Sequence, residues 1–277
     1  IIDAGWSETG VMVPMTTRFP DLRGFIDRQH ARGRKVLLWI GTWLWDGLDK
    51  EYCVTIDGEP MTTDPSNPRY IKLLKSWIHE LISPDGYNAD GFKIDQLAYS
   101  PTYHRTRHGP RFGLTKEDKD AHKKTIRTHG DLWGVEMLYK LQKTIYDTAK
   151  AAKPDCLVTS STVHPYFDDT MDMVRIHDMG RVAKDIFEAM QARVDLGKAA
   201  LPMALTDTDD WIHTNYDTWM KYTSGSHVLG VPCIFYAERF MLNWKAEPAT
   251  KFIPMGDLKK IAQAWNKAYA KRKTKKK

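Results

Sequence analysis

Two aspartates stand where short apolar segments of the sequence end. Asp95 closes the segment Gly91-Phe-Lys-Ile, and Asp178 closes the segment Met173-Val-Arg-Ile-His. Both segments are typical of buried strands, and the carboxyl ends of parallel strands meet at one edge of a sheet. Two carboxylates at such an edge suit glycoside hydrolysis, in which one attacks the anomeric carbon and the other protonates the leaving oxygen. The alternative for Asp95 is a simple helix cap.

Side chains near these aspartates fit the same chemistry. Lys93 is two residues before Asp95 and so lies on the same strand face, where it can bind sugar hydroxyls and keep Asp95 ionised. Arg175 can do the same near Asp178. Four of the ten tryptophans follow or end predicted strands, where an aromatic ring can stack on a sugar: Trp6, Trp39, Trp43 and Trp45. The alternative for each ring is packing in the core.

Other acids in the chain compete with this pair. Three lie in one predicted loop, where we interpret them as loop and capping residues because none ends an apolar strand: Asp168, Asp169 and Asp172. A second group beside Trp211 is a weak candidate for a cation site, since no histidine or regular spacing supports it: Asp207, Asp209 and Asp210.

Strand and helix patterns alternate along the chain. The predicted strands are 1–3, 35–40, 91–95, 156–160, 173–178, 201–207 and 231–237. The predicted helices are 21–34, 68–82, 131–152, 182–196, 219–228 and 256–271. This order predicts an α/β protein of the (β/α)8 TIM-barrel class, with the first of eight strands missing or upstream of Ile1. Residues 99–129 are expected to form a long loop, as a lid or the wall of a subsite.

Composition limits the alternatives. The chain has 277 residues, of which 42% are hydrophobic, enough for one barrel-sized domain over 1–270. Six of the 41 basic residues fall in 271–277, a tail expected to be disordered, and the remaining 35 equal the 35 acidic residues. This balance argues against a nucleic-acid partner.

Three separated cysteines argue against a disulfide scaffold or zinc site, and no apolar run suits a membrane span. The sequence does not indicate a compartment.

Several short motifs, in order, resemble one family of enzymes. They are Asp3-x-Gly-Trp6, FPDL with KVLLWI, DGFKID ending at Asp95, VRIHD ending at Asp178, and Asp209-Asp-Trp ahead of VLGVPCIFYA. Together they are similar to the catalytic barrel of the retaining α-glycosidases, which comprise α-galactosidase and raffinose-synthase-like enzymes and their α-glucosidase relatives. The similarity runs from the family's second barrel strand to its eighth.

This resemblance implies a function and a set of roles. Asp95 matches the nucleophile and Asp178 the general acid/base. Six positions match residues that contact the sugar, the last two less closely: Asp3, Trp6, Trp39, Lys93, Arg175 and Asp210. The implied enzyme is a retaining hydrolase of a terminal α-linked sugar, with α-galactosides favoured over α-glucosides, a covalent glycosyl-aspartate, and carboxylates about 5 Å apart. It requires no metal or organic cofactor, acts on an oligosaccharide or glycoside, and carries flanking β-sandwich domains in the full-length protein.

Two departures from the family pattern bear on specificity. Ala4 stands where the galactosidases usually carry a second acid, and residues 160–166 replace the expected glycine-rich loop. The alternative hypothesis is therefore a barrel that binds glycans without turning them over, or an inactive fragment of such an enzyme. Hydrolysis and transglycosylation are not distinguished, because water and a sugar hydroxyl compete for the same intermediate.

Overall fold

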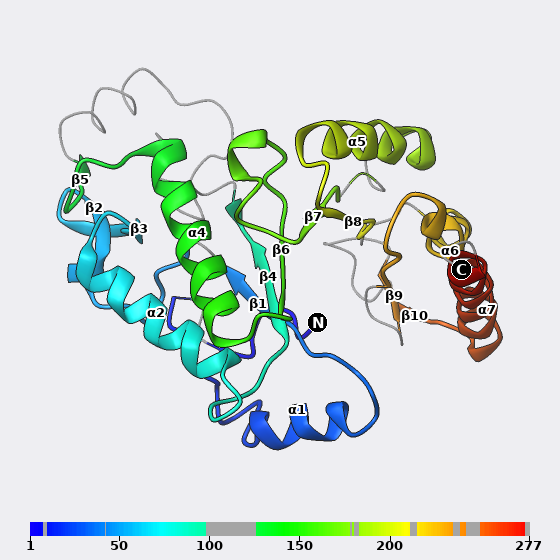
Figure 1. Ribbon diagram of the computed structural model, residues 1–277, viewed down its shortest axis with the longest axis horizontal. Helices are drawn as coiled ribbons and strands as arrows, with labels where there is room; N and C mark the ends of the chain where they lie inside the picture. The colour runs from blue at the N-terminus through cyan, green and yellow to red at the C-terminus, as the bar shows by residue number, and fades with distance from the viewer. Residues whose placement is uncertain are drawn as a thin grey trace. The chain divides into compact units, whose positions relative to one another are not determined.

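A computed structural model describes the chain in two compact units (Figure 1). Unit 1 comprises residues 1–160 and 169–171, and unit 2 comprises residues 161–168 and 172–277. The described residues are 1–7, 10–41, 43–97, 126–177, 179, 183–210, 215–234, 239–241 and 250–274. The single barrel domain over 1–270 stays a prediction.

Unit 1 is built on a parallel sheet in the order β1 (Leu38–Gly41), β4 (Gly91–Asp95) and β6 (Leu157–Ser160). Trp39 pairs with Lys93, which pairs with Thr159 on the far strand. Successive residues of a strand point to opposite faces. The register therefore places Trp39, Lys93 and Thr159 on one face of the sheet.

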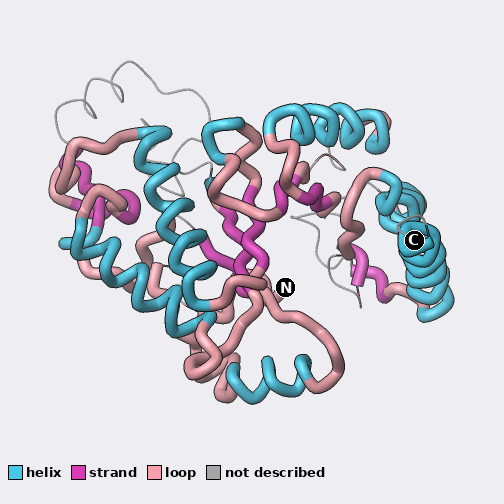
Figure 2. Tube along the Cα trace, viewed as in Figure 1, coloured by secondary structure: helices cyan, strands magenta, loops and turns pink. Residues whose placement is uncertain are grey.

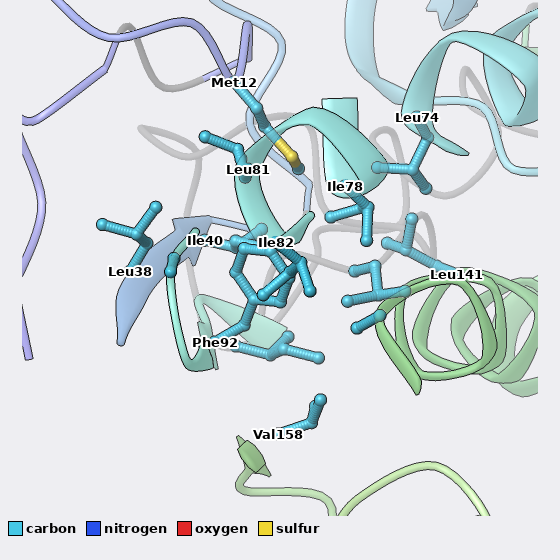
Figure 3. Close-up of a cluster of buried hydrophobic side chains, with 14 of the residues drawn as sticks. Met12, Leu38, Ile40, Leu74, Ile78, Leu81, Ile82, Phe92, Leu141 and Val158 are labelled. Atoms are coloured by element: carbon cyan, nitrogen blue, oxygen red, sulfur yellow. The ribbon is translucent and has the colours of Figure 1, made fainter. Parts of the chain in front are cut away.

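The opposite face of this sheet packs against two helices, α2 (Pro68–Ile82) and α4 (Gly134–Ala152), which lie side by side (Figure 1). Figure 3 shows this core, formed by Leu38, Ile40, Phe92 and Val158 from the strands and by Leu74, Ile78, Leu81, Ile82 and Leu141 from the helices. The strand and helix alternation predicted for residues 35–160 is confirmed. It leaves the face that carries Lys93 free of these helices.

The start of unit 1 also follows the predicted order. Ile2 forms a parallel bridge with Leu38, so the first residues lie along the outer edge of β1. Helix α1 (Leu22–His30) comes next, and Asp21 caps it by accepting a hydrogen bond from the Gly24 N–H. This helix lies within the predicted range 21–34.

A small antiparallel sheet was not predicted. Strands β2 (Cys53–Ile56), β3 (Glu59–Thr63) and β5 (Ile126–Arg127) pair in the order β3-β2-β5, after the short helix η1 (Lys50–Tyr52). Asp57 and Gly58 both have positive φ, 50° and 81°, as a two-residue type I′ hairpin requires. This Asp-Gly turn was the sequence signal that could have revealed the hairpin. Residues 126–127 belong to β5, whereas most of the predicted loop 99–129 lies outside the described residues.

Unit 2 contains two paired parallel strands, β7 (Met173–Arg175) and β8 (Leu205–Asp207), with an isolated bridge from Asp207 to Val231. Its helices are η3 (Pro165–Phe167), α5 (Ile186–Ala200), α6 (Tyr216–Gly225), η4 (Ser226–Val228) and α7 (Met255–Thr274). Two further strands, β9 (Arg239–Met241) and β10 (Thr250–Phe252), form an antiparallel pair. Helix α5 lies between β7 and β8 in the chain, and Figure 2 shows helices and strands in different colours along the trace.

Three predictions are corrected in unit 2. The predicted strand 201–207 begins only at Leu205, because residues 202–204 form a turn and bend. Within the predicted strand 231–237, only Val231 makes a described bridge. Helix α7 runs to Thr274, so residues 271–274 are helical where a disordered tail was predicted, and 275–277 lie outside the described residues.

The described residues form a mixed α/β fold with five parallel strands, three in unit 1 and two in unit 2. This class is compatible with a TIM-barrel arrangement. Within the described ranges no closed barrel is formed, so the eight-stranded barrel itself stays a prediction.

Candidate active site

Asp95 is the last residue of β4, at the carboxyl end of the unit 1 sheet, where it pairs with Gly41. The Trp39 indole Nε1–H donates to Asp95 Oδ2 at 3.0 Å, and the Gln96 backbone N–H donates to Oδ1 at 2.9 Å. Gln96 has a φ of 64°, a left-handed conformation uncommon for a residue other than glycine. Each carboxylate oxygen therefore accepts an N–H. Hydrogen bonds of this kind favour the ionised form of a carboxylate.

Lys93 and Asp3 form an ion pair on the same sheet face as Asp95. Lys93 Nζ donates to Asp3 Oδ2 at 2.7 Å, although 90 residues separate the two in sequence. The Lys93 side chain is 3% exposed and the Asp3 side chain is 42% exposed. Backbone bonds of Ile2 to Leu37 and Trp39 bring Asp3 to this edge of the sheet. The pair places a half-exposed carboxylate over a buried ammonium, both able to bind hydroxyl groups.

The tryptophans near Asp95 are buried. Trp6 is 1% and Trp39 4% exposed, and the Trp6 indole N–H donates to the Trp39 carbonyl at 2.8 Å. Trp43 is 1% exposed, and its indole nitrogen has no hydrogen-bond partner among the described residues. In this structure the burial of these rings favours core packing and support of the strand end over stacking on a sugar. Contact of Trp6 and Trp39 with a substrate stays a prediction.

The predicted binding residues of unit 2 lie in a buried cluster of charges. Arg175 donates to Asp209 Oδ2 from Nη2 at 2.6 Å and from Nε at 2.8 Å, and both side chains are 2% exposed. The Asp209 backbone N–H donates to Asp207 Oδ1 at 3.1 Å. Asp210 is also buried. The recorded partner of Arg175 is thus Asp209, a pairing that sequence reasoning missed because it depends on two neighbouring strand ends.

Asp178 lies outside the described residues, so its position and its separation from Asp95 stay predictions. The backbone that leads to it is held by helix α5. Arg193 Nη1 donates to the carbonyl oxygens of Ile176 at 3.2 Å and His177 at 2.7 Å. These bonds hold the backbone at Ile176 and His177, the two residues that precede Asp178.

Two of the competing acids, Asp168 and Asp169, interact with nearby helices. Asp169 accepts from the Tyr139 hydroxyl at 3.1 Å and lies 3.3 Å from Lys143 Nζ, both on α4. Asp168 caps the end of η3. These positions agree with the interpretation of both as loop and capping acids.

Across the described ranges, no group of three or more His, Cys, Asp or Glu side chains is arranged to hold a metal ion, and Asp207, Asp209 and Asp210 form no such group. No described helix has the length and hydropathy needed to cross a bilayer. Cys53, Cys156 and Cys233 carry thiols and are not joined by disulfides.

Comparison with solved structures relates the fold to known enzymes. A GH31 α-xylosidase from a soil metagenome, solved with xylose, superposes with a TM-score of 0.53 over 80% of this chain and 34% of its own, at 15% identity. The cycloalternan-forming enzyme from Listeria monocytogenes, solved with its pentasaccharide substrate, gives a TM-score of 0.52 over 87% of this chain and 23% of its own, also at 15% identity. The chain folds like a glycoside hydrolase.

This likeness concerns the fold. The chain spans 34% of the length of the α-xylosidase and 23% of the length of the cycloalternan-forming enzyme, and at this identity the similarity does not extend to a substrate. No protein-family model and no curated protein matches the sequence. The α-galactosidase-like specificity implied by the motifs stays a prediction.

Proposed function

We propose that this protein is a retaining glycoside hydrolase that cleaves a terminal α-linked sugar, with α-galactosides favoured and α-glucosides the alternative. The observation that carries the proposal is the set of groups on one face of the unit 1 sheet. Asp95 ends β4 with an N–H donor on each oxygen, and Lys93 and Asp3 lie on the same face. A fixed carboxylate beside hydroxyl-binding groups is what attack on a sugar requires.

In the proposed reaction Asp95 is the nucleophile and Asp178 the acid/base. An Asp95 oxygen bonds to the anomeric carbon as the glycosidic bond breaks, and the Asp178 proton goes to the leaving oxygen. Asp178 then removes a proton from water, the resulting hydroxyl bonds to the anomeric carbon, and the ester to Asp95 breaks. Two inversions restore the α configuration.

The remaining predicted residues would bind the sugar. Asp3 offers a partly exposed acceptor, and Lys93 offers donors that stay dry because its side chain is buried. Arg175 and Asp210 are the other two residues predicted to bind the sugar. Flanking β-sandwich domains of the full-length protein would complete the site.

The test is hydrolysis of aryl α-glycosides of galactose, glucose, xylose and N-acetylgalactosamine by the full-length protein. We expect turnover on one sugar, lost in both Asp95→Asn and Asp178→Asn, with azide rescuing only Asp178→Asn when the leaving group is good. Asp169→Asn is the matched control, since its carboxylate holds helix α4 rather than a strand end, and it should keep most of the activity.

Each other outcome has a defined meaning. Turnover that survives Asp95→Asn would show that the nucleophile lies elsewhere. Turnover lost in Asp169→Asn and rescued by azide would assign the acid/base role to that residue. Binding of a glycan without turnover on any sugar would support the alternative hypothesis of a non-catalytic glycan-binding barrel.

A further inference from the structure

The Trp39 indole reaches Asp95 across a residue with no side chain. Trp39 and Gly41 lie on the same face of β1, and Gly41 pairs with Asp95 on β4. A Cβ atom at residue 41 would lie 2.6 Å from Trp39 Cη2 and 2.6 Å from Leu44 Cδ1. Because real atoms do not approach so closely, any side chain at residue 41 would displace the indole or Leu44.

We propose that Trp39 is a positioning residue for the Asp95 carboxylate and that Gly41 provides the space for its indole. The inference rests on the proposed function, and it gives Trp39 a task other than sugar stacking. The indole is 4% exposed, so water does not compete well for the Nε1–H that Asp95 Oδ2 accepts. Trp6 also holds the Trp39 backbone, because the Trp6 indole N–H donates to the Trp39 carbonyl oxygen.

The second carboxylate oxygen is held in a complementary way. Gln96, directly after Asp95, has a left-handed backbone conformation, and its backbone N–H donates to Asp95 Oδ1. A carboxylate with one fixed donor at each oxygen cannot rotate freely about its Cβ–Cγ bond. The expected benefit is orientation of the attacking oxygen, which affects the chemical step more than substrate binding.

The chain supplies a matched pair of substitutions to test this. Trp39→Phe keeps a buried ring and removes the N–H that Asp95 accepts. Trp43→Phe makes the same change at a ring of similar burial, whose nitrogen has no hydrogen-bond partner in the part of the chain that the structure describes. On the aryl glycoside that the protein turns over, we expect Trp39→Phe to lower kcat about 10- to 100-fold with little change in KM. Trp43→Phe should keep both constants.

Two further readouts separate positioning from mere structural support. The acid limb of the pH–rate profile should move to higher pH in Trp39→Phe, because the ionised carboxylate loses a donor. Gly41→Ala should reproduce the kcat loss while Trp39 itself is intact. An increase in KM with unchanged kcat in Trp39→Phe would overturn the proposal and return Trp39 to the sugar-contacting role.

The hydrogen bond can also be tested without turnover, so failure of the proposed function does not decide the result. In proton–nitrogen NMR spectra of the full-length protein, the Trp39 indole signal is assigned by its loss in Trp39→Phe, and the Trp43 signal likewise. We expect the Trp39 proton to move upfield in Asp95→Ala, or in Asp95→Asn if the alanine variant does not fold, while the Trp43 proton stays. An unmoved Trp39 signal would refute the contact itself.

Discussion

The Lys93 side chain is almost entirely buried, whereas the Asp3 carboxylate that it contacts is partly exposed to water. The exposed fraction of the side chain is 3% for Lys93 and 42% for Asp3. A charge without hydration depends on its acceptors, while a half-exposed carboxylate can recover water if it loses its partner. The two members of this pair should therefore respond unequally to mutation.

We predict that Asp3→Asn lowers the free energy of unfolding by about 1–3 kcal/mol, and that Lys93→Met lowers it by less. The asparagine leaves the buried ammonium a weaker acceptor, whereas the methionine removes the buried charge. Urea denaturation of both variants measures this. Glu51→Gln, in the exposed pair with Arg69 at 2.8 Å, is the control and should change stability by about 0.5 kcal/mol or less. A larger loss in Lys93→Met than in Asp3→Asn would contradict the argument.

At the scale of elements, the amino end of β4 is held in place by hydrogen bonds to Asp90, the residue directly before the strand. Asp90 is 4% exposed and accepts hydrogen bonds from Val36 N at 2.8 Å, His30 Nε2 at 2.6 Å, Lys35 Nζ at 3.0 Å and Lys153 Nζ at 2.9 Å. These donors come from the ends of α1 and α4 and from the segment before β1. The Asp90 carboxylate thus links the end of α1, the segment before β1 and the end of α4 to the start of β4.

This arrangement predicts a pH-dependent stability. Burial acts to raise the pKa of Asp90, but the Val36 N–H, Lys153, His30 and Lys35 outweigh it and hold the pKa well below its usual range. Since the folded pKa is the lower one, the stabilisation is present above the unfolded value of about 3.9 and is lost as pH falls below it. Asp90→Asn should cost about 3–5 kcal/mol at pH 7, in urea denaturation. The difference from the unsubstituted protein should shrink below about pH 4, and a difference that is constant with pH would refute this linkage.

The contact between β4 and β6 depends on a glycine. Gly91 has a φ of 146°, and a Cβ there would lie 1.8 Å from the Leu157 carbonyl oxygen. Gly91→Ala should lower the free energy of unfolding by about 3 kcal/mol or more, through strain and separation of the strands. Gly256→Ala is the control, because a Cβ at that position on α7 would lie within 4 Å of no atom beyond its own helix turn, and this variant should be as stable as the unsubstituted protein or slightly more stable. Equal melting temperatures for the two variants would contradict the close approach.

At the scale of the whole molecule, the cysteines report separately on the two units. Cys53 and Cys156 of unit 1 are 3% and 2% exposed, whereas Cys233 of unit 2 is only half-buried. Burial, with the carboxylates of Asp64 and Asp49, raises the pKa of the Cys53 thiol to about 12. Since the thiolate is the reactive form, Cys53 should be unreactive in the folded protein.

We predict that iodoacetamide labels Cys233 first, and Cys53 and Cys156 only after unfolding. Peptide mass spectrometry over a time course measures the order, and labelling in denaturant is the control in which all three should react. Early labelling of Cys156 would instead show that unit 1 opens locally without global unfolding.

The sequence by itself determined the elements whose signals are local. Helix α2 was predicted with its observed bounds because the apolar spacing that indicates it lies within the helix itself, and the structure shows that Asn67 caps it and Pro68 begins it. The strand ending at Asp95 was found in the same way. The β2-β3 hairpin carried a local signal in Asp57-Gly58, which was not used.

The tertiary structure decided which side chains meet. Trp39 and Asp95 are 56 residues apart, Lys93 and Asp3 are 90, and Arg175 and Asp209 are 34. The sequence placed most of these residues at strand ends, but neither the Trp39 N–H on Asp95 nor the burial of Trp6 and Trp39 followed from it. Periodicity shows which face of one strand a residue lies on. Which side chains a residue contacts on the next strand depends on the register between the parallel strands. For Trp39 it also depends on the absence of a side chain at Gly41.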